Sequence, residues 1–320
     1  MLKSNRNANL EVNTMKIAVI DLGTNTFNLL IVEKDNNGGY KKLSSNRIPV
    51  KLGEGTINKG FIAEIPFRRG IGALKEYSEI INSQKINNVV ALATSAIRTA
   101  KNGLDFILKA KNETGINIEI IDGDREAELI YFGNRKAVKM NNDLSLIMDI
   151  GGGSTEFIIA NNEAIVWKKS FLLGAARLLE FINPSDPITE DEIKKLYNYF
   201  DVQLKPLIEA CKSNKPFELI GSSGAFDSIV DMMSGEYNTE VLSDNKTEYN
   251  INLEKYKILS DKIIHSTYAQ RLKTKGLIEM RVDMIVISCL FVSYILNQFN
   301  LNQLRVSMYS LKEGVIFDIK

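Results

Sequence analysis

Residues 146–160, LIMDIGGGSTEFIIA, carry the clearest structural pattern in the chain. An apolar run leads to Asp149, a glycine cluster follows, and a second apolar run begins after Glu156. Short apolar runs on either side of a glycine cluster predict a strand, a tight turn and a second strand. Glycines tolerate positive φ and let backbone N–H groups come close to an anion, so the turn is a candidate phosphate loop. Its candidate phosphate-binding residues are Gly151, Gly152, Gly153 and Ser154.

Residues 16–32, KIAVIDLGTNTFNLLIV, repeat this pattern. Asp21 stands at the point equivalent to Asp149, and a small polar turn replaces the glycine cluster. One such hairpin, taken alone, is also compatible with an ordinary surface turn that binds nothing. Two copies instead favour an internal duplication, in which two similar α/β subdomains face each other across a cleft. The candidate phosphate-binding residues of the first copy are Thr24, Asn25 and Thr26.

Carboxylates flank both turns and would repel a phosphate group. Asp149 and Glu156 bracket the glycine cluster, and Asp21 precedes the first turn. A hard cation or a water molecule between carboxylate and phosphate would remove this repulsion. Both remain open here. If a cation is bound, Mg²⁺ or another divalent ion is expected, with Asp21, Asp149 and Glu156 as its candidate ligands.

The composition is that of an ordinary globular chain of 320 residues, 44% hydrophobic and 25% charged. The formal net charge of +1 provides no global attraction to DNA or to a membrane, so anion binding must be local. The longest apolar run, residues 284–296, is too short to span a bilayer and predicts a buried helix. Cys211 and Cys289 lack metal-ligand spacing and favour a reducing, cytoplasmic setting. Residues 1–14 lack the apolar segment of a secretory signal and are expected to form a disordered leader.

Two further candidate site residues follow predicted strands. The apolar strand 88–94 leads to Arg98, at an edge where α/β folds place ligands, so Arg98 could bind a phosphate. The strand 116–121 leads to a helix with Glu126 in its first turn, where a carboxylate could take a proton from water. The alternatives are a surface arginine for Arg98 and a helix-dipole partner for Glu126.

A third small-residue turn follows the strand predicted at 217–220 and precedes a helix. Such a turn can bind an anion, although a simple tight turn explains the pattern equally well. Its residues are Gly221, Ser222, Ser223 and Gly224.

The other predicted elements carry no chemistry of their own. Helical spacing predicts long helices at 61–83 and 189–211, and a strand and a helix close the chain. His265 is the only histidine, which nearly excludes a histidine-rich metal site or a Ser-His-Asp hydrolase.

Five motifs occur in an order that resembles one known family. They are DLGTNTFNLLI, ATSAIRTAKNG, GDREAELIYFG, DIGGGSTEFII and GSSGAFDSI. Together they resemble the exopolyphosphatase and guanosine pentaphosphate phosphatase family. The resemblance implies a two-domain actin-like fold, a duplicated ribonuclease H-like α/β architecture with an interdomain cleft. It places the N-terminal domain at residues 15–135 plus about 306–320, and the C-terminal domain at 136–305.

The resemblance also implies roles for individual residues. Glu126 matches the glutamate that activates the attacking water, and Asp149 and Glu156 match acidic residues linked to the cation and to that water. Arg98 and the three small-residue turns match positions that contact phosphate. The implied substrate is polyphosphate or guanosine pentaphosphate, between which the sequence does not choose, and the implied assembly is a homodimer.

Two positions depart from the family pattern. Arg125 replaces a glutamate that usually precedes the catalytic one, and we expect its charge to lower the pKa of Glu126 and to add phosphate affinity. Lys312 stands where an arginine is common, so a bidentate contact is weakened there. Two alternative functions remain open: a small-molecule kinase of the same superfold, and a non-catalytic polyphosphate or nucleotide sensor, for which Arg125 is the hint.

Overall fold

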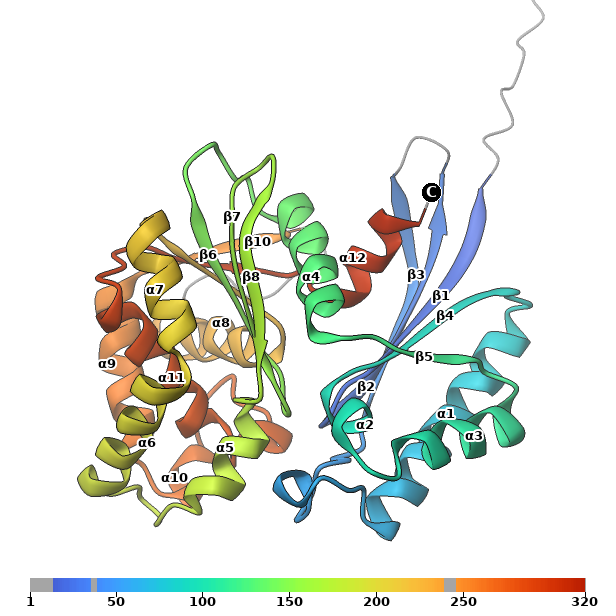
Figure 1. Ribbon diagram of the computed structural model, residues 1–320, viewed down its shortest axis with the longest axis horizontal. Coiled ribbons are helices and arrows are strands. Elements are labelled where there is room, and N and C mark those ends of the chain that lie inside the picture. The colour runs from blue at the N-terminus through green and yellow to red at the C-terminus, as the bar shows by residue number, and fades with distance from the viewer. Residues whose placement is uncertain (1–13, 36–38, 239–245, 320) are drawn as a thin grey trace, which may run out of the picture.

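The computed structural model describes residues 14–35, 39–238 and 246–319. The predicted leader, residues 1–14, lies outside these ranges except for Thr14, which is exposed. Two sheets organise the described residues, one in each half of the chain (Figure 1).

Sheet A belongs to the first half and has the strand order β3-β2-β1-β4-β5. Its first three strands pair antiparallel, and β4 and β5 continue the sheet in parallel beside β1. Alternate residues of β1 face opposite sides of the sheet, and both sides are buried and apolar. The strands are β1 (Met15–Leu22), β2 (Thr26–Lys34), β3 (Tyr40–Pro49), β4 (Asn88–Ala93) and β5 (Ile118–Ile120).

Sheet B belongs to the second half and has the order β10-β11-β9-β6-β7-β8. From β8 to β11 this order and its pairings repeat those of sheet A from β3 to β5, and β10 adds one edge strand. The repeat confirms the predicted duplication and the actin-like α/β fold. The strands are β6 (Ser145–Ile150), β7 (Thr155–Ala160), β8 (Ile165–Phe171), β9 (Leu219–Ser222), β10 (Glu248–Ile251) and β11 (Leu304–Ser307).

Helices cover the outer face of each sheet (Figure 1). The first half contains the 3-10 helix η1 (Ile57–Lys59) and the helices α1 (Glu64–Ser83), α2 (Ser95–Thr99), α3 (Gly103–Thr114) and α4 (Gly123–Ala137). The second half contains α5 (Ala175–Ile182), α6 (Glu190–Gln203), α7 (Lys205–Asn214), α8 (Gly224–Tyr237), α9 (Leu253–Ile264), α10 (Tyr268–Arg271), the 3-10 helix η2 (Glu279–Arg281), α11 (Ile285–Gln298) and α12 (Leu311–Asp318).

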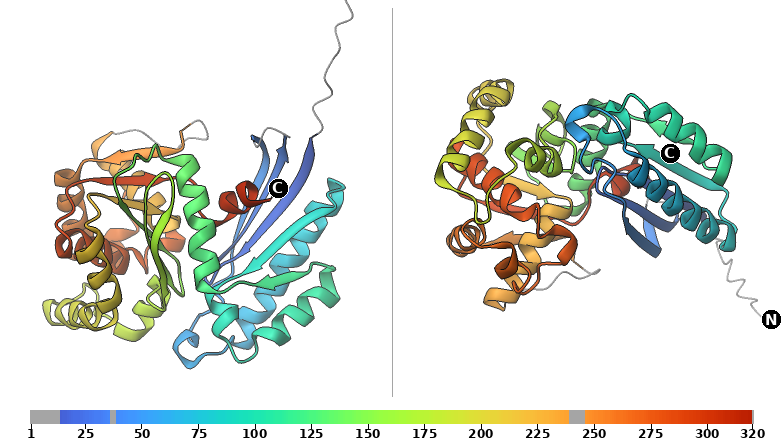
Figure 2. Two further views of the ribbon diagram at one scale, coloured as in Figure 1. Left: turned by 45° about the horizontal axis from the view of Figure 1, so that its top comes forward. Right: turned by 90° about the horizontal axis from the view of Figure 1, so that it is seen from below.

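The helices α4 and α12 form a middle layer between the two sheets, as Figures 1 and 2 show. α4 follows sheet A in the chain but packs on β7 and β8 of sheet B. α12 follows sheet B but packs on β1 of sheet A. Each half therefore ends in a helix that contacts the sheet of the other half. The boundary predicted between residues 135 and 136 falls within α4.

The predicted helix at 189–211 was wrong in extent, because the chain forms two helices there. Thr189 is the predicted N-cap, and it forms a capping box with Glu192. α6 then ends at Gln203, since Pro206 lacks the N–H that would continue the helical hydrogen bonds. The apolar run at 284–296 lies in the buried helix α11. Among the described residues, no helix has both the length and the apolar character to cross a bilayer.

Gly314 and Gly133 allow α12 and α4 to touch backbone to backbone. A Cβ atom at Gly314 would overlap the carbonyl of Leu129, and one at Gly133 would overlap the carbonyl of Ser310. Because backbone atoms cannot move aside, we expect Gly314→Ala to destabilise the protein by about 2–3 kcal/mol. Thermal unfolding measures this loss. Gly72→Ala, in an exposed part of α1 with open space around the new atom, is the control and should be neutral or stabilising.

Candidate active site

A cavity of about 930 Å³ lies between the two halves, and both contribute to its walls. The three small-residue turns, predicted from separate parts of the sequence, meet there. Most predicted site residues line the cavity, namely Asp21, Thr24, Asn25, Thr26, Glu126, Asp149, Gly151, Gly152, Gly153, Ser154, Ser223 and Gly224.

Four predicted site residues lie behind this wall rather than in it. Arg98 donates from Nη1 to Oε2 of Glu126 at 2.8 Å, so it contacts the carboxylate and not the cavity. Glu156 is buried opposite Asp149 in the β6–β7 ladder. Ser222 donates from Oγ to Oδ2 of Asp149 at 2.6 Å, and Gly221 packs against Phe226. In this structure these residues support the groups that line the cavity.

The two aspartates occupy equivalent positions in the duplicated hairpins. Asp149 faces Glu156 across its ladder, and Asp21 faces Asn28 across the other. Asn28 donates from Nδ2 to Oδ2 of Asp21 at 3.1 Å. Burial raises the pKa of Asp149, and it raises the pKa of Asp21 to about 6 although Lys312 opposes the shift. Burial and the charges of Glu126 and Asp149 raise the pKa of Glu156.

Glu126 lies in the first turn of α4, and 7% of its surface is exposed. Burial raises its pKa to about 7, against the lowering effect of Arg98, while Asp21 and Asp149 add to the rise. Arg98 is itself held by the carbonyl of Ile121, to which its Nη1 donates at 2.9 Å. A carboxylate poised near neutral pH and fixed by an arginine is suited to accept a proton from water.

The glycine loop is held from behind by α5. The backbone N–H of Ala175 donates to the Gly151 carbonyl at 2.9 Å, and that of Ala176 donates to the Gly152 carbonyl at 3.0 Å. In a trans peptide the next N–H points opposite to the carbonyl, so the N–H groups of Gly152 and Gly153 point away from α5. Because the loop lines the cavity, we expect these groups to form an anion-binding nest.

The loops of the two halves touch in front of this nest. A Cβ atom at Gly153 would lie 2.5 Å from Thr24 Oγ1 and 2.7 Å from Ser95 Oγ. Ser95 was not among the predicted site residues, yet it lines the cavity, and its buried hydroxyl has no hydrogen-bond partner in the structure. The sequence could have identified Ser95 as a candidate site residue, because it follows the same strand end that led to the prediction for Arg98.

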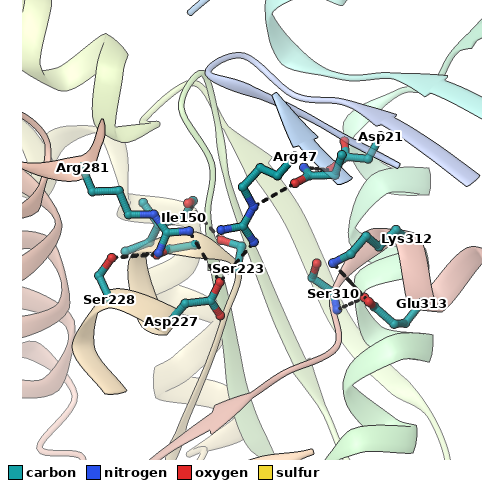
Figure 3. Close-up of polar contacts among 12 residues, drawn as sticks. Asp21, Arg47, Ile150, Ser223, Asp227, Ser228, Arg281, Ser310, Lys312 and Glu313 are labelled. Carbon is teal, nitrogen blue, oxygen red and sulfur yellow. Dashed lines mark hydrogen bonds and ion pairs between the residues drawn. The ribbon is translucent and has the colours of Figure 1, made fainter. Parts of the chain in front are cut away.

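Sequence reasoning also missed three charged residues at the cavity, Arg47, Asp227 and Arg281, which line it together with Lys312, already noted above (Figure 3). Arg47 on β3 reaches across the cleft and lies 3.6 Å from Asp227 of α8, and Arg281 lies 3.5 Å from the same carboxylate. Burial would lower the pKa of Lys312, but Glu313, Asp227 and Asp21 raise it. These side chains come from distant segments, so no local pattern could have grouped them.

Of the two effects expected of Arg125, the lowering of the pKa of Glu126 was wrong, and the added phosphate affinity stays a prediction. Its guanidinium pairs with Glu128 at 2.6 Å and with Asp318 at the end of α12, and it is not part of the cavity wall. The pKa of Glu126 is raised and not lowered, because burial is the largest effect on it. Successive residues of a helix point in different directions, which explains why Arg125 does not act on its neighbour.

The carboxylates do not form a ready three-ligand metal site. No group of three or more His, Cys, Asp or Glu side chains that could hold a metal ion occurs within residues 14–35, 39–238 and 246–319. Mg²⁺ commonly binds through one or two carboxylates plus water and substrate phosphates. The cavity-lining carboxylates of Asp149 and Asp21 fit such a partly substrate-made site.

Comparison with known proteins places this chain in a family. The Ppx/GppA phosphatase family matches residues 30–320. This chain belongs to the Ppx/GppA phosphatase family. Family membership identifies the protein as a phosphatase, consistent with the predicted resemblance.

Relatives of this phosphatase match over most of its length. A crystal structure of an exopolyphosphatase from Cytophaga hutchinsonii is 40% identical, covers 95% of this chain and 97% of its own, and gives a TM-score of 0.92. The PPX-GPPA enzyme of Aquifex aeolicus is 26% identical with a TM-score of 0.77, covering 96% and 100%. Exopolyphosphatase 1 of Mycobacterium tuberculosis is 25% identical over 303 residues, 94% of this chain and 87% of that protein.

Proposed function

We propose that this phosphatase removes the terminal phosphate from a phosphoanhydride chain, inorganic polyphosphate or guanosine pentaphosphate, with Mg²⁺. The observation that carries the proposal is Glu126, a buried carboxylate with a pKa of about 7 at the wall of the cavity that the glycine loop also lines. The names of the relatives support polyphosphate in particular.

The proposed reaction is an in-line attack of water on the terminal phosphorus. The N–H groups of Gly152 and Gly153 hold the phosphoryl oxygens, and Glu126 takes a proton from the water as its oxygen bonds to phosphorus. The bond from phosphorus to the bridging oxygen breaks, and the chain leaves one phosphate shorter. Arg98 keeps the Glu126 carboxylate in place through its 2.8 Å hydrogen bond.

We expect Asp149, with Asp21 and Glu156 nearby, to hold the divalent cation together with the substrate. When bound, the cation would neutralise charge on the phosphoryl oxygens. A cytoplasmic location, which rests on the two free cysteines, and a homodimer, which rests on the family resemblance, are further proposals.

The experiment is phosphate release with Mg²⁺ from long polyphosphate, short polyphosphate and guanosine pentaphosphate, without any acceptor. Release from at least one of them supports the hydrolase, and the relative rates rank the substrates. Transfer only in the presence of an acceptor would support the kinase. Binding without release would support the sensor, although Arg125, its only hint, points away from the cavity.

The pH dependence of release follows from the raised pKa of Glu126. Only the ionised carboxylate accepts a proton, and burial keeps Glu126 protonated up to a pH of about 7. We therefore expect kcat/KM to rise about tenfold per pH unit below pH 7 and to level off above it. A rate profile at constant Mg²⁺ and ionic strength measures this. A profile that already levels off near pH 4.5, the ordinary pKa of a glutamate, would contradict the prediction.

A further inference from the structure

Arg177 of α5 completes the support behind the glycine loop. Its backbone N–H donates to the Gly152 carbonyl at 3.1 Å, and its side-chain Nε donates to the Gly153 carbonyl at 2.9 Å. Because the Gly153 carbonyl is drawn toward α5, the N–H of Ser154 in the same peptide points the opposite way. The guanidinium thus orients a third N–H group of the proposed nest.

The same guanidinium reaches the first half of the chain. Nη1 of Arg177 donates to the carbonyl of Ile57 at 3.0 Å and to Oδ1 of Asn58 at 3.3 Å, both in η1. Asn58 in turn donates two hydrogen bonds to α5. Its Nδ2 donates to the Arg177 carbonyl at 3.1 Å, and its backbone N–H donates to Glu180 Oε1 at 3.2 Å. One side chain therefore joins the phosphate loop of the second half to the first half.

Burying the Arg177 guanidinium in this contact costs free energy of folding. Arg177 is partly buried, its Nη2 is buried without a hydrogen-bond partner in the structure, and burial lowers its pKa. Burying a guanidinium that bonds to carbonyls, with one nitrogen left unpaired, costs free energy. A role in the function of the loop would explain why the arginine is kept. Arg177 and Asn58 do not line the cavity, so they act through the loop and not on a substrate.

We propose that Arg177 is a positioning residue that couples closure of the cleft to the geometry of the phosphate loop. When η1 of the first half is in place, both ends of the guanidinium are bound and the Gly153–Ser154 peptide is fixed with its N–H toward the cavity. When the halves separate, the guanidinium loses the Ile57 and Asn58 bonds and the loop loses rigidity. This inference rests on the proposed function, because it assigns the loop to phosphate.

The main test compares Arg177→Met with Arg271→Met. Arg271 is a buried arginine of the same half that bonds to the carbonyls of Ser266 and Val282 and pairs with Asp186, away from the cavity. For Arg177→Met we expect kcat to fall about 100-fold. Without the guanidinium, the Ser154 N–H is no longer held in place as a donor to the transition state. Arg177→Lys, which can bond one end only, should recover part of this. Arg271→Met should lower the melting temperature and leave kcat unchanged.

A second test asks whether the two ends of the guanidinium are coupled. Asn58→Ala removes the two side-chain bonds between Asn58 and Arg177, keeps the bond from Nη1 to the Ile57 carbonyl and does not touch the loop. Because this weakens the first-half end only in part, we expect kcat to fall about fivefold. In the Arg177→Met background the same change should have no further effect. Additive losses would overturn the coupling, and so would a folded Arg177→Met with kcat within twofold of the wild type.

Tripolyphosphate binding, measured by calorimetry, separates this inference from the proposed function. If the wild type binds tripolyphosphate but releases no phosphate from any substrate, the hydrolase proposal fails. The inference then still stands if Arg177→Met weakens binding about tenfold and Arg271→Met does not. It fails if both variants bind as the wild type does. If Arg177→Met does not fold, tripolyphosphate binding is measured with Arg177→Lys and Asn58→Ala instead. Weaker binding than that of the wild type supports the inference, and unchanged binding by both contradicts it.

Discussion

Glu126→Gln is expected to lower the turnover number for phosphate release by about 1,000-fold or more. The amide keeps the size of the carboxylate and can still accept the hydrogen bond from Arg98 at 2.8 Å, but it cannot take a proton from water. Binding of tripolyphosphate should persist, because the N–H groups of the glycine loop are untouched. Turnover under saturating substrate and binding by calorimetry measure the two quantities separately.

Glu119→Gln is the matched control, since Glu119 is an exposed glutamate on the strand that precedes α4. It should behave as the wild type in both measurements. A Glu126→Gln protein that keeps more than about a tenth of the wild-type turnover would remove Glu126 from the role of general base. The phosphatase would then need another base, and the buried Glu156 beside Asp149 would be the next residue to test.

The parts of the site that depend on neighbouring residues could be predicted from the sequence. The hairpin around Gly151 has its strands, its turn and its carboxylates within one short stretch, and the register pairs Asp149 with Glu156. The repeat around Asp21 then implied the second half of the fold. Glu126 was placed in a first helical turn by the strand before it, and the structure puts it there.

The parts that depend on distant residues could not be predicted. Arg98 was expected to bind phosphate because it follows a strand end, but its partner Glu126 comes from another helix. Arg125 is adjacent to Glu126 in sequence and points instead to Asp318, 193 positions away. Contacts of this kind depend on how α4 and α12 pack between the sheets, and no local pattern encodes that packing.

Gly153→Ala is expected to lower kcat/KM by about 100-fold or more, with little loss of stability. The new Cβ would lie 2.5 Å from Thr24 Oγ1, 2.7 Å from Ser95 Oγ and 2.9 Å from Ser95 Cβ. The Thr24 and Ser95 hydroxyls can rotate, but the Ser95 Cβ cannot, so the two loops must separate by some tenths of an ångström. A reaction that needs water, phosphorus and base in line loses rate steeply with such a displacement. The fold tolerates it, because the clash lies across the cleft and not within either core.

Gly152→Ala provides a graded comparison within the same loop. Its Cβ would meet mainly the Asn25 side chain, with Nδ2 at 2.5 Å, and this amide can swing aside at the cost of its contact with Met284. We therefore expect a smaller loss, about tenfold, for Gly152→Ala than for Gly153→Ala. Steady-state kinetics show which of the two variants loses more kcat/KM, and Gly72→Ala, which should not change kcat/KM, is the control. If Gly153→Ala keeps wild-type kcat/KM, the close approach of the two loops is not needed for the reaction. The loops would then act separately, and the catalytic geometry would depend on the glycine loop and Glu126 alone.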